Sequence, residues 1–384
     1  MPPVANREQR VGWLELFFDL VFVVSIAQLT ELGEAAPGVP AILLIAAVLL
    51  AVWLTWNNTT LYVNISGGVS VRERLLVFGA MAGVAMMAIA IPTITDAGQP
   101  IFAIGYAVAR TAMWPLWGHE QVIAPLRGWG PFIYGPVLAA LWVAGIAVPA
   151  PYRLIVWGVL FVVELVWVLA LLPSAPHDSG HMIERVGLFI MIVLGESVFI
   201  LVRAVAERPT PAVWIVAGIT FATICGLWWR YSDLSTGMRE RMLARDSGAI
   251  FRDVLVIAHF VVVLGLVLLA AGFGIAITHA GSARLPVGAL VVLLTGLGVF
   301  ELSQLFMAAR FAVRPVVALV KALPSLVAIA LFATLGSGWP PAVVTGAVLL
   351  GTVAEILLST ALKRTALGEV RPSPSSPTAA APRS

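Results

Sequence analysis

The sequence has 384 residues, of which 60% are apolar and only 11% are charged, and its mean hydropathy is +0.99. Soluble domains usually have about 25% charged residues, so this composition excludes a soluble enzyme, a disordered protein and a coiled coil. The net charge of +3 does not indicate a nucleic-acid partner, because the basic residues stand in short segments between apolar runs, where they set membrane topology.

Apolar runs of about 20 residues recur along almost the whole chain, and a helix of that length crosses the ~30 Å hydrocarbon core of a bilayer. Proline and glycine residues separate the runs. The sequence therefore predicts an all-α, polytopic membrane helix bundle of about twelve transmembrane helices. The predicted spans are 12–33, 38–62, 72–93, 99–118, 130–149, 152–173, 182–205, 211–232, 252–278, 285–309, 314–336 and 341–363.

Two polar segments interrupt or follow these spans. The longest predicted internal loop, 232–251, contains basic and acidic residues, and the segment 367–384 is rich in Pro, Ser and Ala. A tail of that composition cannot bury enough apolar surface to fold. We therefore expect a disordered cytoplasmic tail over 367–384.

The distribution of Lys and Arg predicts the orientation of the bundle. If the N-terminus is cytoplasmic, the cytoplasmic segments hold Arg7, Arg10, Arg72, Arg74, Arg127, Arg185, Arg239, Arg241, Arg245, Arg310, Arg314, Lys363, Arg364, Arg371 and Arg383. The opposite side then keeps only Arg153, Arg203, Arg208 and Arg284. Positive charge accumulates on the cytoplasmic side of membrane proteins. We therefore expect a multi-pass cell-membrane protein with both termini in the cytoplasm.

Similar segments recur in the two halves of the chain. The first span contains Asp19 and the seventh contains Glu196, and an Arg-Val-Gly triplet precedes each of them, at Arg10 and Arg185. Six spans per half is an even number, so both halves insert with the same orientation. The sequence thus predicts two parallel six-helix repeats, over 1–175 and 176–366, related by a pseudo-two-fold axis along the membrane normal, with a possible site on that axis.

Several ionisable residues lie within or at the ends of the predicted spans. A charge at the bilayer centre costs at least ~2.5–3.5 kcal/mol, so such residues are rarely without a role. They are Glu15, Asp19, Arg110, Glu164, Glu196, His259, Glu301 and Glu355. We treat all of them except His259 as candidates for a transport path, because His259 stands alone on an apolar face and is more typical of a satisfied core histidine.

Asp19 and Glu196 are the strongest of these candidates. Because they occupy corresponding points of the two repeats, we expect them to face each other across the axis and to form a site for a cation or a proton. Glu15 lies four residues before Asp19 and shares its helical face. The alternative is that buried acids pair with arginine and fix helix packing. Arg110 could neutralise either Glu164 or Asp19, and for Glu164, Glu301 and Glu355 the structural role is the favoured interpretation.

Other chemistries lack a motif in this sequence. It contains neither a phosphate-binding Gly-x-x-x-x-Gly-Lys-Ser/Thr loop nor a His-Glu-x-x-His metal pair. His177, Asp178 and His181 are of metal-ligating types, but a wet loop at the membrane surface explains them better. We therefore expect no cofactor, no metal and no enzymatic activity.

Two motifs resemble those of a known family. The segment Glu15-Leu16-Phe17-Phe18-Asp19-Leu20-Val21-Phe22-Val23 resembles the N-terminal signature of the bacterial low temperature requirement A (LtrA) family. The segment from Glu184 through Phe189 to Ser197 resembles that family's second signature. The resemblance spans the membrane domain and implies a multi-pass membrane protein that is linked by name to growth in the cold, without an established biochemical activity.

A looser resemblance concerns the potassium channels that have a Phe-Ser-Asp motif at the start of each of two six-helix repeats. The pattern Glu15-x-Phe17-x-Asp19-x-x-Phe22 is similar to that motif. It implies that the first and seventh spans line a pore, with Asp19 and Glu196 supporting them. Phe18 replaces the serine, and Leu-Gly-Glu-Ser stands in the second half, so the resemblance does not extend to potassium selectivity.

The sequence therefore supports two function hypotheses from different classes. The first is a transporter or channel for protons, monovalent cations or a small solute. The second is a non-transporting membrane protein that acts in stress or cold adaptation through partner binding. The lipid bilayer is the partner common to both, and the sequence predicts no oligomeric state.

Overall fold

The computed structural model describes residues 12–66, 70–120, 132–150, 152–171, 173, 178–244, 247–336 and 338–368. Within these ranges the chain forms helices and no strand. The first half contains α1 (Trp13–Ala35), α2 (Val39–Ser66), α3 (Val71–Ala90), α4 (Gly98–Glu120), α6 (Leu138–Ala144) and α7 (Tyr152–Leu171). A π-helical turn, η3 (Ile133–Val137), precedes α6, and the short helical turns η1 (Ile91–Thr93) and η4 (Gly145–Ala147) follow α3 and α6.

The second half begins with two long helices. Its elements are α8 (Ser179–Glu207), α9 (Pro211–Ala244), α10 (Gly248–Phe251), α11 (His259–Thr278), α12 (Val287–Arg310), α13 (Pro315–Leu335) and α14 (Pro341–Gly368). The π-helical turn η6 (Arg252–Ala258) joins α10 to α11. Asp178 begins α8 as its N-cap, because its side chain accepts hydrogen bonds from the backbone N–H groups of Gly180 and His181.

Among the described residues, ten helical segments are long and apolar enough to cross a membrane. The helix α4 and the shorter apolar helix Ile133–Ala147 occupy the places of the fourth and fifth predicted spans. These observations confirm the predicted polytopic helical membrane bundle.

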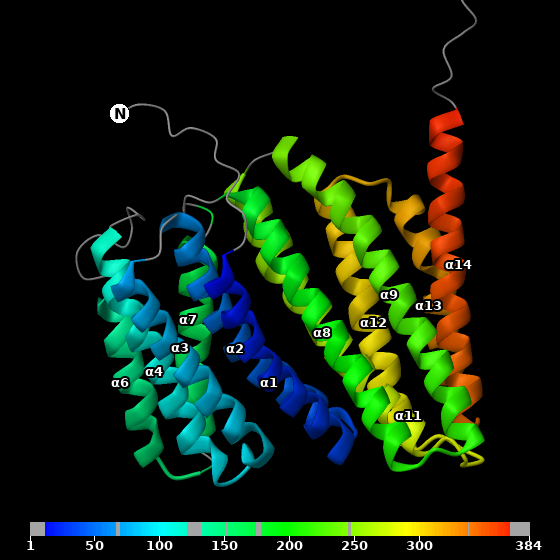
Figure 1. Ribbon diagram of the computed structural model, residues 1–384, viewed down its shortest axis with the longest axis horizontal. Coiled ribbons are helices and arrows are strands. Elements are labelled where there is room, and N and C mark those ends of the chain that lie inside the picture. The colour runs from blue at the N-terminus through cyan, green and yellow to red at the C-terminus, as the bar shows by residue number, and fades with distance from the viewer. Residues whose placement is uncertain are drawn as a thin grey trace, which may run out of the picture.

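The two halves of the chain lie side by side. Figure 1 shows the helices up to α7 on the left and those from α8 onward on the right, with α1 and α8 adjacent in the middle. The helix α11 is the most enclosed of the apolar helices, and it contacts both α1 and α2 of the first half. The start of α1 and the end of α14 lie at the same end of the bundle (Figure 1), as an even number of crossings requires.

Corresponding helix pairs make the most extensive contacts in each half. In the first half α3 packs along α4, and in the second half α11 packs along α12. Glycine allows both close approaches. A Cβ atom on Gly83 would lie 2.5 Å from the carbonyl oxygen of Gly105, and one on Gly265 would lie 2.8 Å from the backbone nitrogen of Phe300. A duplication would produce such paired contacts, and the division into two repeats stays a prediction.

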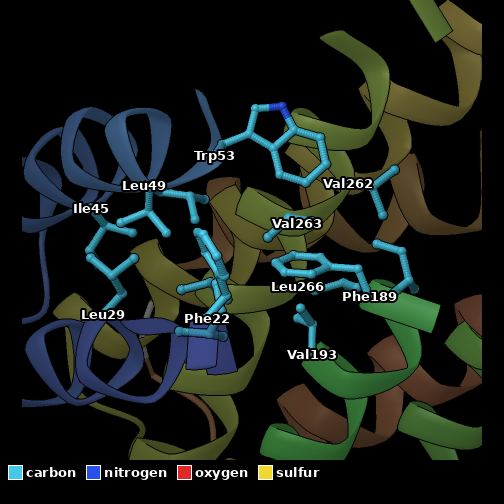
Figure 2. Close-up of a cluster of buried hydrophobic side chains, with 14 of the residues drawn as sticks. Phe22, Leu29, Ile45, Leu49, Trp53, Phe189, Val193, Val262, Val263 and Leu266 are labelled. Atoms are coloured by element: carbon cyan, nitrogen blue, oxygen red, sulfur yellow. The ribbon is translucent and has the colours of Figure 1, made fainter. Parts of the chain in front are cut away.

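An apolar cluster fills the contact region between the halves. Figure 2 shows Phe22 of α1, Trp53 of α2 and Phe189 of α8 close to side chains of α11. The Trp56 ring lies 5.1 Å from the Trp53 ring and 4.9 Å from the Phe189 ring. Trp53 Nε1 donates a hydrogen bond of 3.0 Å to the carbonyl oxygen of Val256, in η6. Large aromatic side chains therefore pack the region where the predicted axis would run.

Two predicted polar segments differ from the structure. The predicted loop 232–251 is wrong over residues 232–244, which continue α9, and over residues 248–251, which form α10. Its charged residues end the apolar run, but Met, Leu, Arg, Glu and Ala are all good helix formers. The helix α14 continues to Gly368, so the first two residues of the predicted tail are helical. Residues 369–384 lie outside the described part of the chain.

Candidate functional site

The first of three buried charged clusters joins α1 and α2 to α8. Asp19 is completely buried, and its Oδ1 accepts hydrogen bonds of 2.7 Å from Arg185 Nη2 and of 2.7 Å from Trp56 Nε1. Arg185 is 1% exposed and also donates to Thr60. Asp19 is therefore neutralised by an arginine of the other half, and not by Arg110, which had been one sequence-based alternative.

Glu15 lies beside Asp19 on the same face of α1, as predicted. Arg185 Nη1 is 3.2 Å from Glu15 Oε1, and His181 Nε2 is 3.4 Å from Glu15 Oε2. Asn64 contacts His181 Nδ1 at 3.1 Å on the other side of the ring. Asp178 and His181 thus cap and anchor the start of α8, and His177 lies outside the described residues.

The expected cytoplasmic placement of Arg185 is wrong. The helix α8 begins at Ser179, three residues before the predicted start, so Arg185 lies within the second turn of the helix and inside the bundle. The sequence offered one signal for this role, since Arg185 stands inside the second of the two family-like motifs.

Glu196 does not face Asp19, so the expected pair of facing acids is also wrong. Glu196 stands eleven residues after Arg185 on α8, which places it about 16 Å farther along the helix axis. Phe189 and Val193, which lie between these two positions, belong to the apolar cluster in Figure 2. Glu196 is partly exposed, and no hydrogen bond or ion pair joins it to another described residue.

The second cluster lies within the first half, between α4 and α7. Arg110 forms an ion pair with Glu164, and the two side chains are only 2% and 0% exposed. The Tyr106 hydroxyl donates a 2.5 Å hydrogen bond to Glu164 Oε1 and accepts one of 2.9 Å from Arg110 Nη2. The Arg110 guanidinium also lies 4.4 Å from the centre of the Tyr134 ring. The predicted pairing of Arg110 with Glu164 is confirmed, and both side chains are almost completely buried.

The third cluster lies within the second half, between α9, α12 and α14. Arg230 donates two parallel hydrogen bonds to Glu301, from Nη1 to Oε1 at 2.7 Å and from Nη2 to Oε2 at 2.8 Å. The same guanidinium forms an ion pair with Glu355. Glu301 is 1% and Glu355 is 3% exposed. One arginine therefore serves two buried carboxylates.

Glu355 is also held by the backbone of α13. Its Oε1 accepts a 3.1 Å hydrogen bond from the backbone N–H of Ser325. Pro324 precedes Ser325 inside α13, and a proline within a helix removes one helical hydrogen bond and distorts the turn before it. Neighbouring helices commonly satisfy backbone groups freed in this way inside a membrane. Here the carboxylate of Glu355 accepts from the backbone N–H of the residue that follows the proline.

A cavity of about 390 Å³ reaches this third cluster. Arg230, Glu301 and Glu355 form its charged end, and the remaining lining comes from the C-terminal parts of α9, α12 and α14, the start of α13 and the short α12–α13 connection. The Arg230 side chain is 11% exposed, compared with 2% for Arg110. The cavity lies in the part of the bundle near the end of α14, at the upper right of Figure 1.

The sequence did not reveal the role of Arg230 as the partner of two buried acids. It was not among the candidates selected from the sequence, where it stands near the end of the predicted span 211–232. The helix α9 extends fourteen residues beyond it, to Ala244, so Arg230 lies well inside the helix. The signal that could have identified it is charge balance, because Glu301 and Glu355 need basic partners and Arg230 is one of the few basic residues inside the predicted spans of their half.

His259 is a satisfied core histidine, as predicted. It is completely buried, its Nδ1 contacts the Val254 carbonyl oxygen at 2.7 Å, and its Nε2 contacts the Tyr231 hydroxyl at 3.3 Å. In the part of the chain that the structure describes, no group of three or more His, Cys, Asp or Glu residues is placed to hold a metal ion.

Comparison with known proteins adds two findings. Residues 10–359 match the family described as bacterial low temperature requirement A protein (LtrA). The chain is also similar to a protein of Rhizobium meliloti (strain 1021) named "Uncharacterized protein RA0937", with 27% identity over 258 residues. That match covers 59% of this chain and 59% of the relative's length.

Proposed function

The chain belongs to the bacterial low temperature requirement A (LtrA) family, and we propose that this multi-pass membrane protein transports a proton or another cation. The proposed site is the cluster of Arg230, Glu301 and Glu355 at the end of the second-half cavity. We also propose that the protein resides in the cell membrane with both termini in the cytoplasm, because that orientation places most of its Lys and Arg inside. The cavity then opens toward the cytoplasm.

The proposal rests on the ratio of acidic to basic groups in the cluster of Arg230, Glu301 and Glu355. Arg230 compensates Glu301 through two hydrogen bonds, and the same guanidinium is shared with Glu355. Two carboxylates share one guanidinium, so the deep end of the cavity has one more acidic than basic group, while Asp233, Arg241 and Lys321 line the rest of the cavity. A charge inside the membrane is costly unless it is compensated. A proton or a cation from the cavity supplies that compensation.

The position of the cavity favours a carrier rather than an open channel. All its lining residues lie in the parts of α9, α12, α13 and α14 nearest to one end of the bundle, or in the α12–α13 connection at that end. The region between the halves is filled by the aromatic cluster of Figure 2. Access from one side only is typical of alternating access. Pro324 lies inside the continuous helix α13, and proline is a common site of helix bending.

The test is proton and potassium flux through the full-length protein in liposomes, under imposed pH and potassium gradients. Wild type is expected to exceed protein-free liposomes. Glu355→Gln removes the excess charge and is expected to slow the flux by about tenfold or more, which corresponds to ~1.4 kcal/mol in a barrier.

The matched control is the double variant Arg110→Met with Glu164→Met, which removes the closed ion pair of the first half. Replacing both partners of a buried pair by apolar residues of similar volume is often neutral for stability. Its flux is expected to equal that of wild type. Equal flux in wild type and Glu355→Gln, or a loss confined to the double variant, would contradict the proposed site.

A further inference from the structure

The volume and the lining of the cavity indicate which kind of cation it could bind. Its volume of about 390 Å³ falls in the range of sites for small organic molecules, which is about 300–1,000 Å³. Leu234, Met238, Phe311 and Ile356 contribute apolar side chains to the walls. Potassium sites replace the hydration shell of the ion with several oxygen ligands. The lining also includes the oxygen-bearing side chains of Asp233, Gln304 and Ser359, while its apolar side chains are suited to the body of an organic molecule.

The charges along the cavity are arranged by depth. The deep end holds Arg230 with Glu301 and Glu355, and the rest of the lining holds Asp233, Arg241 and Lys321. Arg230 Nη2 already donates to Glu301 Oε2. The same Nη2 also forms the ion pair with Glu355 Oε2, so the two carboxylates share one guanidinium. The deep end therefore has one more acidic than basic group, while Arg241 and Lys321 against Asp233 give the rest of the lining one more basic group.

We infer that the cavity binds an organic ammonium compound, whose positive nitrogen lies against Glu355 and whose apolar body lies along the walls. This inference rests on the proposed function and specifies the substrate class of the same site. A proton and an ammonium group would compete for the single excess negative charge, so that binding of one releases the other. The bound charge stays balanced in both cases.

Gly237 provides a way to test the cavity without changing its charges. It lines the cavity from α9, and a Cβ atom built on it meets no atom within 4 Å. Gly237→Leu therefore fills part of the cavity and leaves Arg230, Glu301 and Glu355 in place. Gly218→Leu is the matched control, because Gly218 lies on the same helix, has equally open space and does not line the cavity.

The probe is tetraethylammonium, whose permanent charge prevents it from crossing the bilayer as a neutral base. Calorimetry on the detergent-purified full chain measures its binding, and uptake of the radiolabelled probe into liposomes measures its transport. We expect wild type and Gly218→Leu to bind and transport it. We expect Gly237→Leu and Glu355→Gln each to weaken binding by about tenfold or more. Gly237→Leu removes space from the cavity, and Glu355→Gln removes the negative charge that contacts the probe.

The outcomes separate this inference from the proposed function. Proton flux that depends on Glu355, together with tetraethylammonium binding that is absent or unchanged in Gly237→Leu, would overturn the inference and leave the proposed function standing. Absence of any Glu355-dependent flux or binding would overturn both. Probe binding that is lost in Gly237→Leu and Glu355→Gln but kept in Gly218→Leu supports both.

Discussion

The first and second halves of the bundle both bury an arginine among acidic side chains, yet they do so in different ratios. Arg110 contacts one carboxylate, that of Glu164, and two tyrosines complete its surroundings. Arg230 contacts two carboxylates, and one side of its cluster is open to a cavity. Arg185, at the contact between the halves, also pairs with two carboxylates, and His181 lies beside one of them. The proposed function therefore rests on the second-half cluster, which combines two carboxylates on one arginine with a cavity of about 390 Å³.

Removing the buried arginine of each half should cause the largest losses of stability. Arg230→Leu leaves two buried carboxylates without their guanidinium, and breaking a buried pair in this way costs roughly 3–5 kcal/mol. Arg110→Leu leaves one carboxylate, which still accepts a hydrogen bond from Tyr106. We expect the Arg230 variant to lose more stability in unfolding measurements on detergent-purified protein. An equal or smaller loss would mean that the two clusters are energetically alike.

Neutralising one acid in each half sharpens the comparison. Glu164→Gln removes the carboxylate that Arg110 contacts and is expected to cost about 3 kcal/mol. Glu355→Gln leaves Arg230 with both of its hydrogen bonds to Glu301, so we expect a loss of about 1 kcal/mol, the net value of one hydrogen bond. The same unfolding assay measures both. If Glu355→Gln proves as destabilising as Glu164→Gln, Glu355 is a structural partner and not a spare charge.

The last of these comparisons concerns the most extensive helix contact in each half. A methyl group on Gly83 would meet the backbone of α4 at 2.5 Å, and one on Gly265 would meet the backbone of α12 at 2.8 Å. Overpacking of this kind costs about 1–3 kcal/mol, and we expect Gly83→Ala to lose more than Gly265→Ala. Gly195→Ala, where a Cβ meets no atom within 4 Å, is the control that should retain full thermal stability.

Most of the fold could be predicted from the sequence, because apolar runs of spanning length and the proline and glycine residues between them determine where each helix can lie. The main error was the loop predicted over 232–251. Hydropathy fell there because of charged residues, while helix propensity remained high enough to continue α9 to Ala244. Hydropathy reports the environment of a segment and not its backbone conformation.

The candidate site was only partly predictable. Glu301 and Glu355 stood out as intramembrane acids, and Arg110 was correctly offered as a partner for Glu164. The partners Arg185 and Arg230 were missed, because each stood close to a predicted span boundary, where arginine is common for topological reasons alone. Corresponding positions in two repeats also do not imply contact. Asp19 and Glu196 were paired by motif, but they lie at different depths along the bundle.

The contact between Asp19 and Arg185 also affects how the protein is made. The two residues are 166 positions apart in the chain, and ribosomes add about 5–20 residues each second, so roughly 8–33 s separate their synthesis. During that interval α1 has left the ribosome with Glu15 and Asp19, while Arg185, which pairs with both, has not been translated. Trp56 of α2, which donates a hydrogen bond to Asp19, is synthesised well before α8.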